Sequence, residues 1–477
     1  MGVVPDNGVK ERLNVVFERQ RIRAIDQRSK PLTSRIKRLR DLKHWIEDNG
    51  QLIQKAIYND FGKPPDSVDL SEIYPLLTEL KDAINNLRSW ARDTKVDSSI
   101  AYLSTTSSVK YEPKGVCLII APWNFPFLLT LGPLVSALAA GNTVILKPSE
   151  MTPNTTELID RMIGDLYKED LVAVFKGDSM MSQELLKLPF DHIFFTGSPQ
   201  VGKIVMTAAA KNLTSVTLEL GGKSPTVVDE TASLNDAAQK IAWGKFMNNG
   251  QTCVAPDYVL VQEKVHDKFV EALQCKTRDL FDSEKKGFNK SSDYARIINK
   301  RHWKRLIELK DEVIQKGGQL EMGGEVNETE CYLAPTILSN IPKGSGIMQE
   351  EVFGPILPVT KYNSIDEVIE KVNHEPKPLA FYYFGKSSKN RERLLRETSS
   401  GTFCVNDCVL QFGHPHLPFG GVNNSGIGKS HGKYGFLAFS NEKAVLRQRV
   451  GFTTTKLVYP PYGKRTRLIL KLLKKFF

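Results

Sequence analysis

Two short apolar segments joined by one helix-length stretch constrain the fold of this chain most. Residues 116–120 (VCLII) and 144–146 (VIL) are continuously apolar, and an apolar stretch that ends near Ala140 joins them. Strands without a polar face are typical of parallel sheets covered by helices on both sides, and the intervening helix predicts a βαβ unit. Residues 172–175 and 192–195 continue the alternation. We therefore predict a Rossmann-like α/β domain in the first half of the chain.

The remainder predicts a second α/β unit that is packed closely against the first. A strand at 258–261 is followed by a long helical region and by another apolar run at 335–338, and the pattern ends around Ser400. Charged amphipathic helices are expected over residues 8–60, and alternating Ser/Thr and apolar residues over 98–112 favour an exposed strand or ribbon. At 477 residues the chain is long enough for two or three such units.

Charge, histidine and cysteine content argue against several classes of function. Six of the eleven excess positive charges fall in residues 464–477, so the body carries only +5 and no nucleic-acid groove is expected. The eight histidines show no metal-ligand spacing, and no metal site is predicted. Six cysteines without CxxC pairs, and an N-terminus without a secretory apolar core, favour a reducing cytoplasmic location with free thiols.

The strongest candidate for chemistry is Cys253, in the polar run NNGQTCVAPD. Amide and hydroxyl side chains are unusual neighbours for a core thiol, although a buried structural cysteine is the alternative. Glu219 follows a predicted strand at 216–218 and precedes a Gly-Gly turn, so it is either a general base or a surface charge. A thiol that attacks a carbonyl and a carboxylate that activates water together indicate covalent acyl chemistry.

Three further motifs lie at the predicted carboxyl ends of strands. Asn124, in PWNFP, is either an oxyanion donor or a turn residue. Residues 195–202 (FTGSPQVG) join a strand to a helix whose N-terminal amides suit a pyrophosphate, although the GxxxxG spacing also fits a plain βα turn. Lys147 and Glu150, in KPSE, are placed either to meet ribose and phosphate groups or to be solvated.

Taken together, the motifs resemble the aldehyde dehydrogenase family. They are PWNFP, KPSE, FTGS, LELGGKSP, GQTCVAPD, EEVFGP and PFGGVNNSGIGKSHG, in the family's order between residues 122 and 432. The short N-terminus, the CVAPDY continuation and residues 405–407 (VND) are similar to the class 3 branch, and residues 111–124 resemble the fatty-aldehyde dehydrogenases of alkane-degrading bacteria. Class 3 loops often carry glycine where this chain has Asn423, which leaves the path of that loop open.

The resemblance implies a role for each motif. Cys253 would form a thiohemiacetal whose oxyanion is held by the Asn124 amide and the Cys253 backbone N–H, and Glu219 would activate the water that hydrolyses the later thioester. NAD(P)+ would accept the hydride. The implied cofactor residues are Lys147 and Glu150 at the adenosine ribose, Gly197, Ser198 and Gly202 at the pyrophosphate, Gly221 in the turn after Glu219, and Glu351 with Phe353 at the nicotinamide. Because Glu150 repels a 2′-phosphate, NAD is favoured, with NADP as the alternative.

The resemblance also implies a division into domains. The implied ranges are 1–93 and 113–218 for an NAD(P)-binding domain, 219–399 for a catalytic domain, 94–112 and 400–445 for a bridging ribbon, and 446–477 for a C-terminal tail. The exposed strand edge of such a ribbon would pair two chains into a homodimer.

The C-terminal tail predicts a basic amphipathic helix. Within residues 464–477 the basic side chains lie on one face, and Leu468, Leu472 and Leu473 lie largely opposite. At 14 residues it is too short and too charged to span a bilayer, but it suits peripheral contact with an anionic membrane. A helix that packs on the dimer partner or covers the substrate entrance fits the same pattern.

Three functions are compatible with these motifs. The sequence favours oxidation of an apolar, medium- or long-chain aliphatic aldehyde to the carboxylic acid. A CoA-acylating dehydrogenase would share Cys253 but would not need Glu219. A non-catalytic binding protein of the same fold would have no use for Asn124, Glu219 and Cys253 together.

Overall fold

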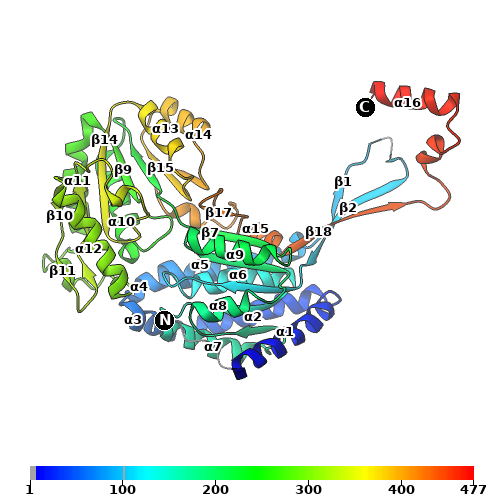
Figure 1. The fold of residues 1–477 in the computed structure, drawn as a ribbon, viewed down its shortest axis with the longest axis horizontal. Coiled ribbons are helices and arrows are strands. Elements are labelled where there is room, and N and C mark those ends of the chain that lie inside the picture. Colours follow the sequence, from blue (N-terminus) through cyan, green and yellow to red (C-terminus); the bar gives the residue numbers. More distant parts are fainter. Residues whose placement is uncertain (1–6, 100–101, 477) are drawn as a thin grey trace.

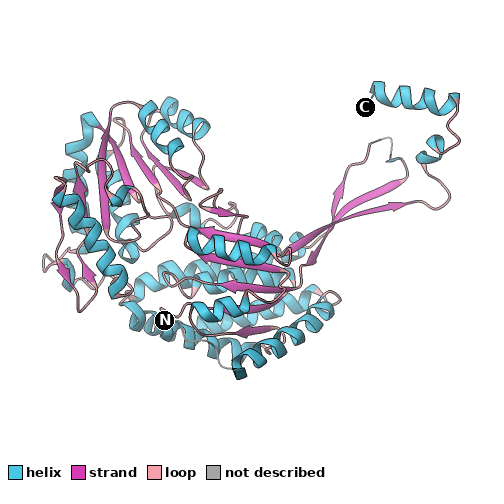
Figure 2. Ribbon diagram, viewed as in Figure 1, coloured by secondary structure: helices cyan, strands magenta, loops and turns pink. Residues whose placement is uncertain are grey.

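Two helix-covered sheets and a projecting ribbon make up the computed structural model, which describes residues 7–99 and 102–476 (Figure 1). Figure 2 shows helices packed around both larger sheets, whereas the ribbon extends away from them and the C-terminal helix lies beyond it. No helix within these ranges is both long and apolar enough to cross a membrane.

The first sheet contains the apolar segments that predicted a Rossmann-like domain. Its strands, in spatial order, are β17 (Gly426–Ile427), β7 (Ser215–Leu220), β6 (His192–Gly197), β3 (Val116–Ile120), β4 (Thr143–Lys147) and β5 (Val172–Val174). All neighbours are parallel except β17, which pairs antiparallel with β7. The chain winds outward from β3 through β4 and β5, then crosses to β6 and β7. The adjacent strands β3 and β6 therefore mark a topological switch point.

Helices cover both faces of this sheet, and every residue of β3 is therefore buried. Val116 and Leu118 belong to one core, and Cys117 and Ile119 belong to the other, as the alternation of side chains along a strand requires. The helices of the first core are α1 (Asn7–Gln27), α8 (Ser179–Leu185) and α9 (Pro199–Ala210). Those of the second are α2 (Leu32–Asp48), α3 (Gly50–Phe61), α5 (Tyr74–Trp90), α6 (Leu128–Ala140) and α7 (Pro153–Leu166).

The second sheet lies beside the first and is also mostly parallel. Its strands are β10 (Gln319–Met322), β13 (Thr336–Ser339), β14 (Ile356–Tyr362), β9 (Tyr258–Gln262), β8 (Pro225–Val228), β15 (Ala380–Phe384) and β16 (Thr402–Val405). The pair β10–β13 is antiparallel, and the other pairs are parallel. The helices of this half are α10 (Leu234–Phe246), α11 (His266–Phe281), α12 (Lys300–Gln315), α13 (Ile365–His374) and α14 (Ser388–Glu397). The α/β fold class predicted from the sequence is confirmed.

The ribbon is an antiparallel three-stranded sheet. It consists of β1 (Thr94–Val96), β2 (Thr105–Pro113) and β18 (Ser440–Gln448), with β2 in the middle. Most side chains of these strands are only half-buried or exposed. Both outer strands therefore present an unpaired edge within the described chain.

Several segments lie outside the domain ranges that the resemblance implied. Strand β16, expected in the ribbon range 400–445, is the edge strand of the second sheet, because its backbone pairs in parallel with β15. The Phe403 ring also stacks on Phe381 of β15 with centroids 4.9 Å apart. Strand β17, in the same range, joins the first sheet. The limit expected at 218/219 falls inside β7, since that strand continues to Leu220.

Candidate active site

Cys253 lies where three cavities meet. The switch-point cavity is lined among others by Trp123, Gly197 and Glu351. The apolar cavity is lined among others by Tyr74, Trp243 and Leu410. The rear cavity is lined among others by Glu79, Ser136 and His431. One thiol therefore faces three spaces with different chemical linings.

A turn of left-handed residues positions the thiol. Asn248, Asn249 and Gly250, at the end of the short helical segment η3 (Met247–Gly250), have φ angles of 52°, 57° and 71°. Asparagine tolerates this region better than most residues, and at Gly250 a Cβ would lie 2.2 Å from the Gly354 carbonyl oxygen. The polar residues around Cys253 thus hold the backbone turn.

The Cys253 thiol is protonated at neutral pH. Burial, with the nearby Glu351 and Glu219 carboxylates adding to it, raises the pKa of this thiol to about 12. Nearby backbone N–H groups lower the pKa without outweighing burial. A thiol in this state needs a nearby base to become the thiolate nucleophile, because the backbone N–H groups alone do not lower its pKa enough.

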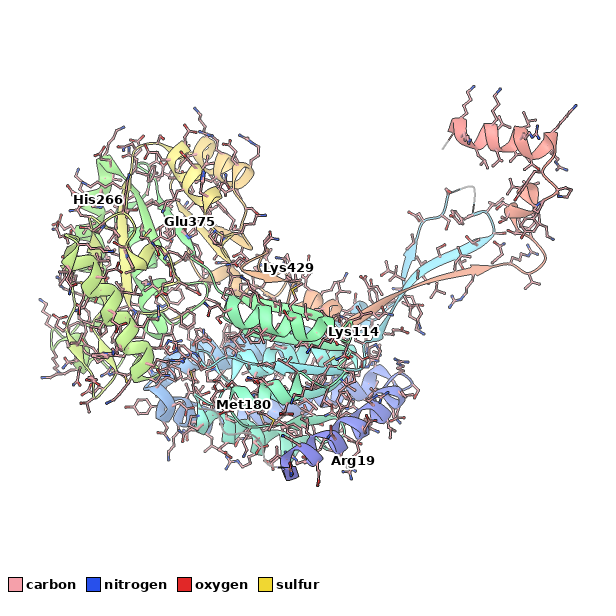
Figure 3. The ribbon with its side chains drawn as sticks, viewed as in Figure 1. Arg19, Lys114, Met180, His266, Glu375 and Lys429 are labelled. Carbon is pink, nitrogen blue, oxygen red and sulfur yellow. The ribbon has the colours of Figure 1, made fainter. Side chains whose placement is uncertain are left out.

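Glu219, which the sequence predicts as a general base, is the candidate for that base. It lies in β7, is 6% exposed and lines both the switch-point and the rear cavity with Cys253. The Ser430 hydroxyl donates to its Oε1 (2.8 Å), while Oε2 has no hydrogen-bond partner among the described residues. Burial raises the pKa of Glu219 to about 8, although the Ser430 hydroxyl and the Lys429 ammonium lower it. Lys429 follows β17 closely (Figure 3).

Asn124 is tied to the loop that carries the thiol. Its side chain, 3% exposed, follows β3 and lines the switch-point cavity. Its Nδ2 donates to the Gln251 carbonyl (2.9 Å), and Asn248 Nδ2 donates to the Asn124 carbonyl (2.9 Å). An amide nitrogen carries two hydrogens, so one N–H of Asn124 is left for another acceptor.

The switch-point cavity gathers most residues that the motifs singled out. They are Asn124, Gly197, Ser198, Glu219, Gly221, Cys253, Glu351 and Phe353. Gly197 and Ser198 join β6 to α9, and the Ser198 side chain caps that helix by accepting from the Val201 N–H (3.4 Å). The free amides and dipole of the α9 N-terminus suit an anionic group. The residues present therefore fit a dinucleotide at the switch point.

The Glu351 carboxylate packs closely against the backbone of Gly221. A Cβ on Gly221 would lie 2.0 Å from Glu351 Oε2, so a side chain there would displace the carboxylate. Burial raises the pKa of Glu351 to about 8, and a hydrogen bond from the Gly222 backbone lowers it. The adjacent Phe353 has a φ of 46°, a conformation that few bulky residues adopt.

Three predicted cofactor residues do not line this cavity. Lys147 ends β4, and its Nζ lies 2.9 Å from Glu150 Oε2, so the two side chains form one ion pair at the carboxyl edge of the sheet. Gly202 lies inside α9, where a Cβ would come within 2.7 Å of Leu220. The structure places Gly202 in the packing of α9 on β7.

Several cavity residues were not predicted as site residues. Trp123 contacts the His302 ring (centroids 5.3 Å apart) and the Phe353 ring (5.4 Å). Arg305 donates to the Val352 carbonyl (2.6 Å). His302 and Arg305 lie on α12, far from any motif, so no local signal identifies them.

Asp257 and Lys223 hold the segment around Glu351 from the other side. Asp257 accepts from the Val352 N–H (2.8 Å) and pairs with Lys223, which also donates to the Glu350 carbonyl (2.9 Å). Asp257 belongs to GQTCVAPD and Lys223 to LELGGKSP, so these motifs carried a signal for both residues.

At Asn423 the loop adopts the left-handed backbone conformation that a glycine would allow. Asn423 has a φ of 54°, which asparagine adopts at small cost, and its Oδ1 accepts from Lys377 Nζ (3.0 Å). The following strand β17 places Gly426 opposite Glu219. The substitution of asparagine for glycine is thus compatible with the loop that backs Glu219.

A dinucleotide-type sheet that faces a thiol and a buried carboxylate is the arrangement of a dehydrogenase with a covalent intermediate. The model of the aldehyde dehydrogenase family matches residues 19–445, and the chain belongs to that family. The family resemblance predicted from the motifs is confirmed.

Relatives and solved structures agree with this assignment. The chain is 42% identical to the 4,4'-diaponeurosporen-aldehyde dehydrogenase of Staphylococcus aureus, over 94% of this chain and 96% of that protein. It is also 42% identical to aldehyde dehydrogenase family 3 member A2 of Mus musculus, over 91% and 88%. The structure of Staphylococcus aureus AldH in a substrate-bound state superposes with a TM-score of 0.93 at 40% identity, covering 97% and 99%. The chain is an NAD(P)-dependent enzyme that oxidises an aldehyde.

Proposed function

We propose that the enzyme oxidises apolar, medium- or long-chain aliphatic aldehydes to carboxylic acids through a thioester on Cys253. The observation that carries this proposal is the meeting of the apolar cavity and the switch-point cavity at one thiol. The lining of the apolar cavity consists of Leu70, Ser71, Tyr74, Pro75, Phe125, Leu129, Trp243, Met247, Thr252, Cys253, Val254, Val409, Leu410, Phe412 and Gly413. None of these side chains carries a full charge at neutral pH, so the cavity can bury an alkyl chain without burying a charge.

The chain's own residues supply the first half of the reaction. Glu219 takes the thiol proton, and the Cys253 sulfur attacks the aldehyde carbon. The free N–H of Asn124 and the Cys253 backbone N–H stabilise the alkoxide of the thiohemiacetal. The residues of the switch-point cavity would hold NAD(P)+, which would supply the hydride acceptor for the collapse of this alkoxide to the thioester.

The second half is hydrolysis. After losing the thiol proton, Glu219 removes a proton from a water molecule and the oxygen attacks the thioester carbonyl. The C–S bond then breaks, the acid is released, and the proton on Glu219 returns to the sulfur to restore the cysteine. The unpaired Oε2 of Glu219 is the oxygen placed to accept that proton. A CoA-acylating enzyme would not need Glu219 to activate water. The burial of Glu219 beside Cys253 therefore favours water as the acyl acceptor.

The substrate proposal is tested by kcat/KM for n-alkanals from two to sixteen carbons. Burial of each added methylene is worth about 0.8 kcal/mol, so kcat/KM should rise about four-fold per carbon until the cavity is full. A flat profile would contradict the proposal.

The covalent step has a separate test. Cys253→Ala should abolish NADH formation, whereas Cys275→Ala, at an exposed thiol on α11, should not change it. NADH formation by Cys253→Ala would exclude this residue as the nucleophile. Product analysis with and without CoA distinguishes the acid from the acyl-CoA.

A homodimer built on the ribbon is part of the proposal. The ribbon leaves the body of the chain and ends in unpaired strand edges, which suit pairing with a second copy. Light scattering after gel filtration should give twice 53.5 kDa. A monomer would refute this part.

The tail is proposed to lie on an anionic membrane surface. Helix α16 (Lys464–Phe476) lies beyond the ribbon, and Leu468 and Leu472 are 59% and 49% exposed (Figure 1). Residues 464–477 carry six basic and no acidic side chains. Co-sedimentation with vesicles that contain phosphatidylglycerol should require residues 464–477. Equal binding without them would contradict the membrane role. It would favour a helix that packs on the dimer partner or covers the substrate entrance.

A further inference from the structure

The partly buried acid Glu79 has no part in the chemistry described so far. It lies on α5 and lines the rear cavity together with Glu219 and Cys253. It also lines an outer cavity, which reaches the exposed His414. Glu79 and His431 are thus shared by two spaces that lead in sequence from the base towards solvent.

We infer that Glu79 is the proton acceptor behind Glu219, and that in each turnover it passes the proton that Glu219 takes from the thiol through the outer cavity to solvent. The inference rests on the proposed hydrolytic role of Glu219. Glu79 does not touch the reacting atoms, so it acts as a positioning and relay residue.

The stoichiometry of the reaction requires such an exit. An aldehyde, NAD(P)+ and water give a carboxylate, NAD(P)H and two protons. Glu219, which is 6% exposed, takes one proton from the Cys253 thiol and later one from the water. The second returns to the Cys253 sulfur when the C–S bond breaks, and the released acid loses the other net proton by its own ionisation. Glu219 must therefore lose the thiol proton before it can activate the water, while substrate and cofactor occupy the other two cavities.

The groups along the rear cavity suit proton transfer. The Ser136 hydroxyl donates to Glu79 Oε1 (3.4 Å), and the Ser430 hydroxyl donates to Glu219 Oε1 (2.8 Å). Burial raises the pKa of Glu79 to about 8, the value that burial also gives Glu219, so transfer between the two costs little free energy. Water that enters a cavity with several polar groups can bridge them.

His431 borders both cavities without trapping a proton. Its ring is stacked on Phe419 (centroids 5.1 Å apart), and burial lowers its pKa to about 4. It therefore stays neutral through the range in which Glu79 titrates. Among the described residues that line the rear and outer cavities with Glu79, the only basic side chains are the imidazole rings of His431 and His414.

Asp82 lies at the outer end of the route, one turn further along α5. Its side chain is 9% exposed, and its Oδ2 has no hydrogen-bond partner among the described residues. A Cβ on Gly432, which lines the outer cavity, would lie 3.1 Å from that oxygen. His416, 69% exposed, lies 4.0 Å from Asp82 Oδ1. The titratable groups that face Glu79 are therefore Asp82 on its own helix, His414 and His431 from the loops, and Glu219 with Cys253 across the rear cavity.

The test is stopped-flow NADH formation by Glu79→Gln with a saturating alkanal. We expect a burst of about one NADH per active site, followed by a steady-state rate about ten-fold below that of the wild type. The slow phase should be accelerated by added imidazole, which can carry protons into the outer cavity. Glu79→Asp should restore most of the rate, and Asp82→Asn should show a weaker form of the same defect.

The control is Glu47→Gln, at an exposed carboxylate on α2 that pairs with Lys43. It should behave as the wild type. A Glu79→Gln enzyme without a burst, or with a slow phase that imidazole and the aspartate variant do not restore, would overturn the relay. If the wild type oxidises no aldehyde, the proposed function fails instead. Should Glu79→Gln not fold, Asp82→Asn decides by the same burst and rescue.

Discussion

The Lys63 ammonium lies 2.8 Å from the Glu72 carboxylate, and neither side chain is exposed. The other oxygen of Glu72 accepts from the backbone N–H of Phe127 (2.9 Å), just before α6. A buried ion pair that also satisfies backbone donors fixes the chain to which it is bonded. The pair thus holds the segment that directly follows Asn124.

Lys63→Met should destabilise the fold strongly. It leaves the buried Glu72 carboxylate without its counter-charge, at a cost of about 3–5 kcal/mol. The free energy of unfolding, from urea titration, measures the effect. Lys37→Met is the matched control, because Lys37 pairs with Asp41 at a distance of 2.8 Å on the surface and the pair contributes about 1 kcal/mol or less. Equal effects of the two substitutions would contradict the role given to the buried pair.

The raised pKa of Glu219 predicts opposite pH effects on activity and stability. Only the carboxylate acts as base, so kcat should rise with pH and level off above about 8. A carboxyl whose pKa is raised in the fold stabilises it fully below the unfolded value near 4.5, and this stabilisation is lost as pH rises to about 8.

Replacing the Glu219 carboxyl by an uncharged amide isolates the effect of its titration on the stability of the fold. Glu219→Gln should gain stability relative to the wild type between pH 4.5 and 8, whereas the exposed Glu271→Gln should not. Urea titrations at several pH values measure both variants. A constant difference between Glu219→Gln and the wild type would show that the buried carboxyl does not titrate as described.

Gly221→Ala should weaken NAD binding with little loss of the fold. The new Cβ would lie 2.0 Å from Glu351 Oε2 and would displace that side chain from the switch-point cavity. We expect KM for NAD to rise at least ten-fold, a loss of about 1.4 kcal/mol of binding. Gly164→Ala, on α7 with nothing within 4 Å of the new Cβ, should instead stabilise the protein by about 0.5–1 kcal/mol.

Glu150→Gln should shift cofactor preference towards NADP. Glu150 is 41% exposed at the carboxyl edge of the first sheet, where its charge would repel a 2′-phosphate. We expect the ratio of kcat/KM for NADP over NAD to rise about ten-fold, corresponding to about 1.4 kcal/mol. Glu157→Gln, at an exposed position on α7, should leave the ratio unchanged. An unchanged ratio in Glu150→Gln would place the adenosine ribose elsewhere.

Much of the site was predictable because its residues belong to contiguous motifs. Eight of the eleven residues singled out from the motifs line one cavity, since the carboxyl ends of neighbouring parallel strands meet at one edge of a sheet. His302 and Arg305 were not predictable, because they reach the cavity from the first two turns of α12, a helix that carries none of the motifs. The division of the C-terminal third also differs from the prediction, because short strands such as β17 are placed by pairing partners distant in the sequence.

By itself, the sequence determined the fold class, the family and the positions of Cys253, Glu219 and Asn124, because apolar periodicity and motif chemistry are local properties. Only the tertiary structure decided the environment of each group. The protonated thiol, the raised pKa of Glu219 and Glu79, and the charge-free lining of the apolar cavity all depend on burial by segments far apart in the chain. Burial sets the cost of a charge, and it exists only once the chain has folded.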